Sequence, residues 1–136
     1  MDTTGQGVAL NEIGQVALTV HDLSEAKEFY RDVFGMRFLF DAGTMAFFQC
    51  GTVRLMIGAA DNHTPQAGTI VYFRVLDIHQ VCTALKQKAV AFLQEPHLVA
   101  RMKTHDLWLA FIKDPAGNTL GLMSEVNRPP LTEHAA

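Results

Sequence analysis

The sequence predicts a single α+β domain that contains two copies of one strand-helix-strand-strand-strand unit. The main observation is an internal repeat, because residues 14–23 align with residues 69–78 without a gap. The residues that match across the two copies are Val16 and Val71, Leu18 and Phe73, Val20 and Val75, and Asp22 and Asp77. The length of 136 residues and the 49% hydrophobic composition suit one domain with a sizeable core. We place module one at about 12–58, a linker at 59–68 and module two at about 69–125.

The first module begins with a strand that leads into a helix. Apolar residues alternate along the strand, so one face packs on the core and the other is free for another role. The apolar positions are Val16, Leu18 and Val20, and the positions between them are Gln15, Ala17 and Thr19. Asp22 is placed to cap the helix, with Glu25 reaching back in a capping box, and Gly35 ends it. The apolar stripe of this helix consists of Leu23, Ala26, Tyr30 and Val33.

Three short strands complete the first module. Apolar and aromatic residues at 37–40, 45–50 and 53–57 are separated by turn residues at 41–44 and 51–52. Such short runs with tight turns are typical of an antiparallel meander.

The second module repeats this order. Asp77 is the expected helix cap, and the helix ends near Lys88, where no glycine marks the stop. Its apolar stripe consists of Ile78, Val81, Cys82 and Leu85. The expected strands are 91–93, 107–112 and 119–123, with a turn at 114–118 in which Pro and Gly supply the backbone angles. The stretch 94–106 is predicted to be irregular, and irregular segments on a rigid scaffold often carry function.

Composition disfavours several classes of partner. The formal net charge of -3 includes no basic stripe of the kind that nucleic acids or anionic membranes attract. No apolar run reaches the roughly 20 residues of a membrane span, and the N-terminus lacks the pattern of a signal peptide. We therefore expect a cytoplasmic protein with no nucleic acid and no membrane partner. In that compartment Cys50 and Cys82 are expected to be reduced thiols.

The doubled unit and its local motifs resemble the glyoxalase/bleomycin-resistance/dioxygenase superfamily, also called the vicinal oxygen chelate proteins. The motifs are Val-x-Asp-Leu/Ile at the start of both helices, Phe-Tyr-Arg-Asp-Val-Phe-Gly-Met at 29–36, and Asp-Pro-Ala-Gly-Asn at 114–118. The likeness covers about residues 12–125. It implies paired βαβββ modules whose curved sheets form a cup, with helices outside, a ligand site inside and a homodimeric assembly. Whether the modules of one chain share a cup, or swap with a partner chain, stays open.

The resemblance also implies four metal-ligand positions, two on the first and last strands of each module. These positions are occupied here by Gln15, Met56, Ile70 and Gly121, with Leu55 replacing Met56 if the register slips by one. Gln15 alone is an acceptable ligand, and a divalent cation needs several N or O donors. We therefore expect no metal cofactor. The resemblance supports the fold and weakens the commonest chemistry of that fold.

Alternation along the strands predicts which other side chains line the cup. The cup-facing positions are Gln15, Ala17, Thr19, Arg54, Ile70, Tyr72 and Arg74, and the expected ligand-binding residues among them are Gln15, Thr19, Arg54, Tyr72 and Arg74. Guanidinium groups bind carboxylates or phosphates and stack on rings, so this set suits an anionic or aromatic ligand. The alternative is that Arg54 and Arg74 lie near sheet edges and pair with surface carboxylates.

A second cluster falls in and after the irregular stretch. It consists of His97, Arg101, Lys103, His105 and Trp108. As a loop it could close over a ligand, with His97 or His105 as a catalytic acid or base near neutral pH. The alternative is a solvated loop whose Trp108 packs into the core, since the sequence assigns no carboxylate to orient either histidine.

Three functions are compatible with these observations. The first is a metal-free binding protein that holds a small aromatic or anionic molecule in the cup. The second is a lyase, isomerase or dioxygenase of the glyoxalase type with an altered metal site built around Gln15. The third is an interaction module whose cup is filled by its own side chains. The missing metal ligands favour the first.

Overall fold

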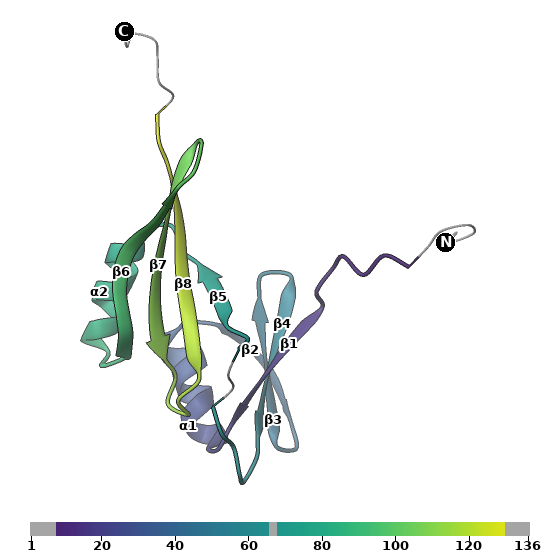
Figure 1. Ribbon diagram of the computed structural model, residues 1–136. Coiled ribbons are helices and arrows are strands. Elements are labelled where there is room, and N and C mark those ends of the chain that lie inside the picture. The colour runs from purple at the N-terminus through teal and green to yellow at the C-terminus, as the bar shows by residue number, and fades with distance from the viewer. Residues whose placement is uncertain (1–7, 66–67, 130–136) are drawn as a thin grey trace, which may run out of the picture.

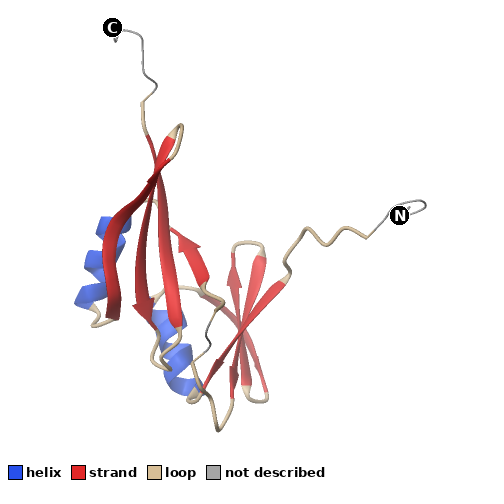
Figure 2. Ribbon diagram, viewed as in Figure 1, coloured by secondary structure: helices blue, strands red, loops and turns tan. Residues whose placement is uncertain are grey.

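The computed structural model describes residues 8–65 and 68–129. Two helices and eight strands follow one another in two βαβββ modules (Figures 1 and 2). The elements of module one are β1 (Gln15–Val20), α1 (Leu23–Glu28), the π-helical turn η1 (Phe29–Val33), β2 (Arg37–Ala42), β3 (Met45–Cys50) and β4 (Val53–Ala59). Those of module two are β5 (Val71–Arg74), α2 (Ile78–Gln87), β6 (Ala91–Arg101), β7 (His105–Lys113) and β8 (Thr119–Asn127). The predicted fold class, α+β with two βαβββ modules, is confirmed.

Each module forms one curved, four-stranded mixed sheet. The strand orders are β1-β4-β3-β2 and β5-β8-β7-β6. In each sheet the first and last strands of the module are parallel, and the other pairs are antiparallel. The helix is the crossover that a parallel pair requires.

The two helices begin as the sequence predicts. The side chain of Asp22 accepts a hydrogen bond from the Glu25 amide at 3.0 Å, and Asp77 accepts one from the Gln80 amide at 3.1 Å. The Glu25 carboxylate points toward His21 instead, 4.0 Å from Nε2, so the first cap is one-sided rather than a full capping box.

The ends of the helices differ from each other. After α1 the chain widens into η1, where the Phe34 amide donates to the Phe29 carbonyl, and Gly35 then takes a left-handed conformation with φ 72°. After α2 the left-handed position is taken by Ala89, with φ 63°. An alanine gives no sequence signal for a helix end, because glycine is the residue that usually occupies this conformation.

The prediction of an irregular stretch at 94–106 is wrong. Strand β6 runs to Arg101 and β7 starts at His105, so the segment is a long hairpin arm. Register shifts interrupt the pairing of β6 with β7 at three places, which hides the period-two alternation. Pro96 lies within β6, where it is tolerated because β6 is an edge strand.

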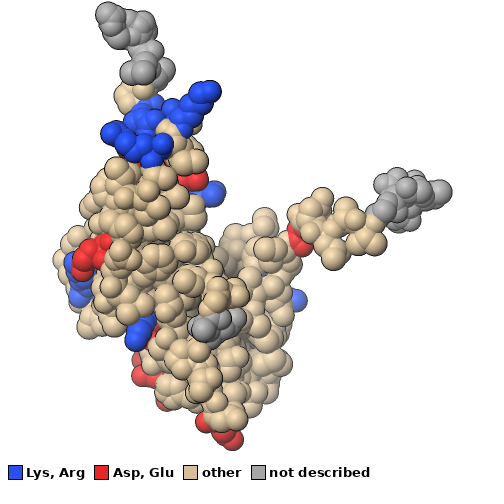
Figure 3. Space-filling model, viewed as in Figure 1, with Lys and Arg blue, Asp and Glu red and all other residues tan. Residues whose placement is uncertain are grey.

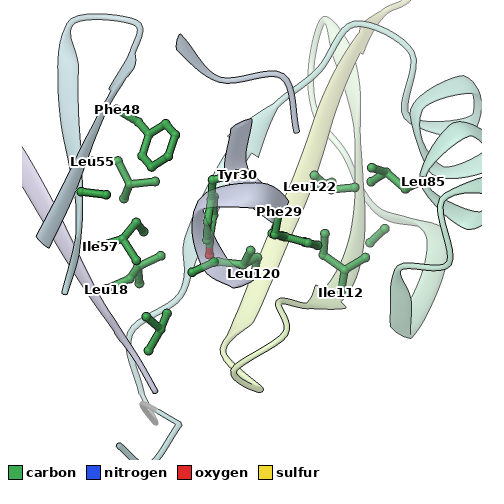
Figure 4. Packing of buried hydrophobic residues seen from close by; sticks show 14 of the residues in the cluster. Leu18, Phe29, Tyr30, Phe48, Leu55, Ile57, Leu85, Ile112, Leu120 and Leu122 are labelled. Carbon is green, nitrogen blue, oxygen red and sulfur yellow. The ribbon is translucent and has the colours of Figure 1, made fainter. Parts of the chain in front are cut away.

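The core lies between the two sheets. Figure 4 shows Phe29 and Tyr30 with residues of sheet one on one side and residues of sheet two on the other. The flanking side chains are Leu18, Phe48, Leu55 and Ile57 from sheet one and Ile112, Leu120 and Leu122 from sheet two. Because the apolar faces of both sheets turn inward onto the helices, the other face of each sheet is directed outward. The open faces therefore do not enclose a shared cup within one chain.

A buried polar network connects the modules. The fully buried Tyr30 donates its hydroxyl to Asp114 at 2.8 Å, and Asp114 also accepts from the amide of Asn118 at 2.8 Å. Asn118 donates in turn to the backbone carbonyl of Thr19 at 2.9 Å. Burial, and then the nearby Asp114 charge, raise the pKa of Tyr30 above its ordinary value, so the phenol remains a donor.

Within the described ranges, no helix has the length and apolar character needed to cross a membrane.

Candidate functional site

Two open sheet faces carry the predicted site residues. The module-one face consists of Gln15, Ala17, Thr19, Phe40, Phe47, Arg54 and Met56. The module-two face consists of Tyr72, Arg74, Leu109, Phe111, Gly121, Met123 and Glu125. The strand register places the members of each set on the same side of their sheet, away from the helices.

Arg54 is the centre of the module-one face. Its Nε donates to Gln15 Oε1 at 2.9 Å, and its Cζ lies 5.5 Å from the centre of the Phe47 ring. The Phe40 ring stacks on the Phe47 ring, with the two ring centres 4.6 Å apart. Hydrogen bonding and the cation–π contact hold the guanidinium in place on an exposed surface.

The two predicted arginines have different partners. Within the described residues, Gln15 is the only group that bonds the Arg54 side chain, and no carboxylate lies within 4.0 Å of it. Arg74 lies 3.7 Å from the Glu125 carboxylate, so the alternative reading of a surface ion pair fits Arg74 and not Arg54. The terminal nitrogens of Arg54 can therefore receive an anion.

Gly121 shapes the module-two face. Tyr72 and Phe111 are its neighbours on the adjoining strands, and their rings meet edge to face with centres 5.8 Å apart. A Cβ atom at position 121 would lie 2.5 Å from Cδ2 of Tyr72. The Tyr72 ring thus fills the space in which a longer side chain at this position would stand.

Glu125 lies between Arg74 and His105, which belong to two different predicted clusters. Its carboxylate lies 3.7 Å from Arg74 Nε and 3.8 Å from His105 Nε2. The expectations from sequence do not include Glu125 as an orienting carboxylate for His105. Alternation along β8 could have found it, since Gly121, Met123 and Glu125 occupy one face at period two.

The second predicted cluster does not form one site. Trp108 packs on the helix side, where its ring lies 4.9 Å from that of His79. Arg101 lies opposite Asp106 in the register, with its Nε 3.4 Å from the carboxylate. His97 pairs with Leu109, and its Nδ1 lies 2.9 Å from the Glu95 carbonyl. Of the residues in this cluster, only His97 and His105 lie on the same side of the sheet as the module-two face.

The chain's own residues do not fit the metal site of the fold. The ligand atom of Gln15 already accepts a hydrogen bond from the guanidinium of Arg54, whose charge opposes a cation there. Met56 offers a thioether, and Ile70 and Gly121 offer no donor side chain. Across the described ranges, no three His, Cys, Asp or Glu side chains gather in a way that could hold a metal ion.

Charge is unevenly distributed over the surface in view. Figure 3 shows Lys and Arg side chains gathered near the far end of the β6–β7 hairpin, while acidic groups lie mostly toward the opposite end. The surface between them is largely uncharged.

Comparison with known proteins gives the family. The sequence profile of the Glyoxalase/Bleomycin resistance protein/Dioxygenase superfamily matches residues 12–122. Among curated protein sequences no match was found.

Solved structures of similar fold cover most of the chain. A lactoylglutathione lyase from Agrobacterium tumefaciens is 25% identical, with TM-score 0.64, over 83% of this chain and 92% of that chain. A glyoxalase family protein from Enterococcus faecalis is 20% identical, with TM-score 0.72, over 85% and 98%. A superfamily member from Alicyclobacillus acidocaldarius is 16% identical, with TM-score 0.69, over 85% and 92%. The chain belongs to the glyoxalase/bleomycin resistance protein/dioxygenase superfamily.

Proposed function

We propose that this protein binds a small aromatic anion without a metal, between the module-one face of one copy and the module-two face of a second copy. The observation that carries the proposal is the guanidinium of Arg54, held by Gln15 over the Phe47 ring on an open face. A carboxylate that meets the free end of a guanidinium forms charge-assisted, bidentate hydrogen bonds.

The aromatic part of the ligand is inferred from the module-two face. Tyr72 is 43% exposed and already meets Phe111 edge to face, which leaves part of its ring available to a ligand. Contacts between aromatic rings stabilise a complex by more than the burial of their apolar area alone would. An aryl group packed on Tyr72 would place its carboxylate toward the opposing Arg54.

The second copy is inferred from the arrangement of the sheets. Because α1 and η1 separate them, one chain presents its two faces in different directions. Both faces expose large apolar rings, with Phe40 45% and Tyr72 43% exposed. In a two-fold dimer each chain would lend one face of each kind, so two equal sites would form.

Calorimetric titration with 3-phenylpropanoate tests the ligand class, with 3-phenylpropanamide as its uncharged match. We expect the anion to bind more tightly than the amide and Arg54→Ala to weaken the anion about tenfold or more. Arg31→Ala removes an exposed arginine that is paired with Asp32, and it should leave affinity unchanged. Equal affinity for acid and amide, or an unaffected Arg54→Ala variant, would contradict the proposal.

Complementation tests the shared site. Arg54→Ala and Tyr72→Ala homodimers should each bind poorly, because every site lacks one partner. A mixed dimer contains one site with both residues intact, so mixing equal amounts should restore about a quarter of the sites. Failure to restore binding, or a monomer by sedimentation equilibrium at the titration concentration, would exclude the shared site.

A second candidate function is a metal-dependent lyase of the glyoxalase type. It is favoured by the 25% identity to the lactoylglutathione lyase and by Gln15 at a ligand position. Purification after growth with Fe, Zn, Ni and Mn, followed by metal analysis and thermal-shift titration, distinguishes the two. A stoichiometric metal would make this candidate the leading one.

We also propose a cytosolic location, supported by the two free thiols Cys50 and Cys82. To test this, cell fractions are treated with a reagent that alkylates free thiols, and the protein is then examined by mass spectrometry. We expect the protein in the cytosolic fraction, with both cysteines alkylated.

A further inference from the structure

A separate apolar cavity lies on the helix side of the molecule, away from both open faces. Its volume is about 330 Å³, which falls within the range of small-molecule sites. It is lined by Val33, Phe34, Met36, Cys50, Phe73, Val75, Val81, Ala84, Leu85, Lys88 and Leu122. These residues come from both modules, so the cavity exists only because the modules pack together.

The aromatic walls of the cavity are held in place by their neighbours. Phe34 meets Phe73 edge to face at 5.5 Å and also contacts Phe29 at 4.7 Å. The π-helical turn η1 sets the position of Phe34, whose amide donates to the Phe29 carbonyl at 3.0 Å. Such turns are rare and are frequent at functional sites.

The polar groups of the cavity are few. Burial raises the pKa of the Cys50 thiol, which therefore stays neutral and contributes an apolar wall. The one charged lining residue is Lys88, whose Nζ lies 3.4 Å from the backbone carbonyl of Asp32. The Asp32 carboxylate is engaged by Arg31 at 3.0 Å, so it competes only weakly for that ammonium.

We infer that this cavity binds a medium-chain aliphatic carboxylate, with its chain among the valine and leucine walls and its carboxylate at Lys88. Five of the eleven lining residues are valines or leucines, and the two phenylalanines are already packed edge to face against each other. An alkyl chain bound among these side chains would be stabilised by dispersion contacts and by the removal of apolar surface from water. The ammonium of Lys88 supplies the complementary charge.

Decanoate is the probe, with decanol as its uncharged match. Titration followed by intrinsic fluorescence or calorimetry should give saturable binding of decanoate to the wild-type chain. Lys88→Gln should weaken decanoate about threefold to fivefold and leave decanol unchanged, because an exposed ion pair contributes modestly. Ala84→Phe, at an exposed lining position of α2, should close the cavity and abolish binding of both.

Two control variants locate the binding. Gln80→Phe adds the same ring elsewhere on α2, outside the cavity lining, and should bind decanoate normally. Arg54→Ala should also bind decanoate normally, which separates this cavity from the open-face site proposed above.

Two other results would overturn the inference. Loss of decanoate binding in Arg54→Ala, with Ala84→Phe unaffected, would place the fatty acid on the open faces. No saturable binding in the wild-type chain, together with a changed oligomeric state of Ala84→Phe, would make the cavity a contact between copies.

Discussion

Gly121 gives the sharpest test of the module-two face. An alanine there would place Cβ 2.5 Å from Cδ2, 2.7 Å from Cε2 and 3.0 Å from Cγ of Tyr72. The backbone of β8 is held by neighbours on both sides, whereas Tyr72 is half-exposed. The ring must therefore swing outward, and it loses its contact with Phe111.

The expected cost of Gly121→Ala follows from that displacement. Overpacking costs about 1–3 kcal/mol, and a side chain that can move places the loss near the lower end, at about 1 kcal/mol. In a Tyr72→Ala background the obstacle is gone, and alanine within a strand is about 0.5–1 kcal/mol more stable than glycine. The sign of the effect should reverse, giving a coupling energy of about 1.5–2 kcal/mol between the two positions.

Urea unfolding of the four proteins at one fixed protein concentration measures this coupling. Gly58→Ala is the matched control, because the nearest atom to its added Cβ is Met45 Cγ at an ordinary 3.8 Å. Its effect should be the same with Tyr72 or Ala at position 72. If Gly121→Ala changed stability equally in both backgrounds, the Tyr72 ring would not occupy the space over Gly121.

Three further predictions follow from other contacts. Asp22→Ala and Asp77→Ala should each lower the free energy of unfolding by about 0.5–2 kcal/mol, and thermal melts that match the wild type would contradict the two caps. Tyr30→Phe should cost about 1.5–3 kcal/mol, because it removes a hydrogen bond to the buried Asp114 carboxylate; an unchanged urea midpoint would show that the bond does not hold the modules together. Because burial raises the pKa of Cys50, its alkylation by iodoacetamide should be slower than that of free cysteine at pH 8 and should accelerate only at higher pH; a rate equal to free cysteine would refute this environment.

The internal repeat, the helix caps and the turns can be predicted from the sequence alone. The caps at Asp22 and Asp77, the helix end at Gly35 and the turn at 114–118 are all decided by residues close in sequence. Alternation in β1 correctly separated the buried Leu18 and Val20 from the exposed Gln15 and Thr19. These features depend on backbone preferences and on which side chains leave water.

The length of strand β6 and the directions of its side chains could not be predicted from the sequence. Each register shift moves the next residue to the opposite face, so alternation gives no consistent period. Nearness in the sequence alone groups Arg101 and Trp108 with His97 and His105. Only the pairing of β6 with β7 shows that Trp108 faces the helices.

The sequence by itself determined the two modules and their helices, because these depend on residue type and local spacing. Tertiary structure alone decided what stands beside each site residue. It placed Glu125 between Arg74 and His105, set the Arg54 guanidinium over Phe47 and filled the space at Gly121 with Tyr72. It also placed α1 and η1 between the sheets and turned the open faces outward. Such contacts join residues far apart in the chain, and their geometry is fixed by packing of the whole core rather than by local preference.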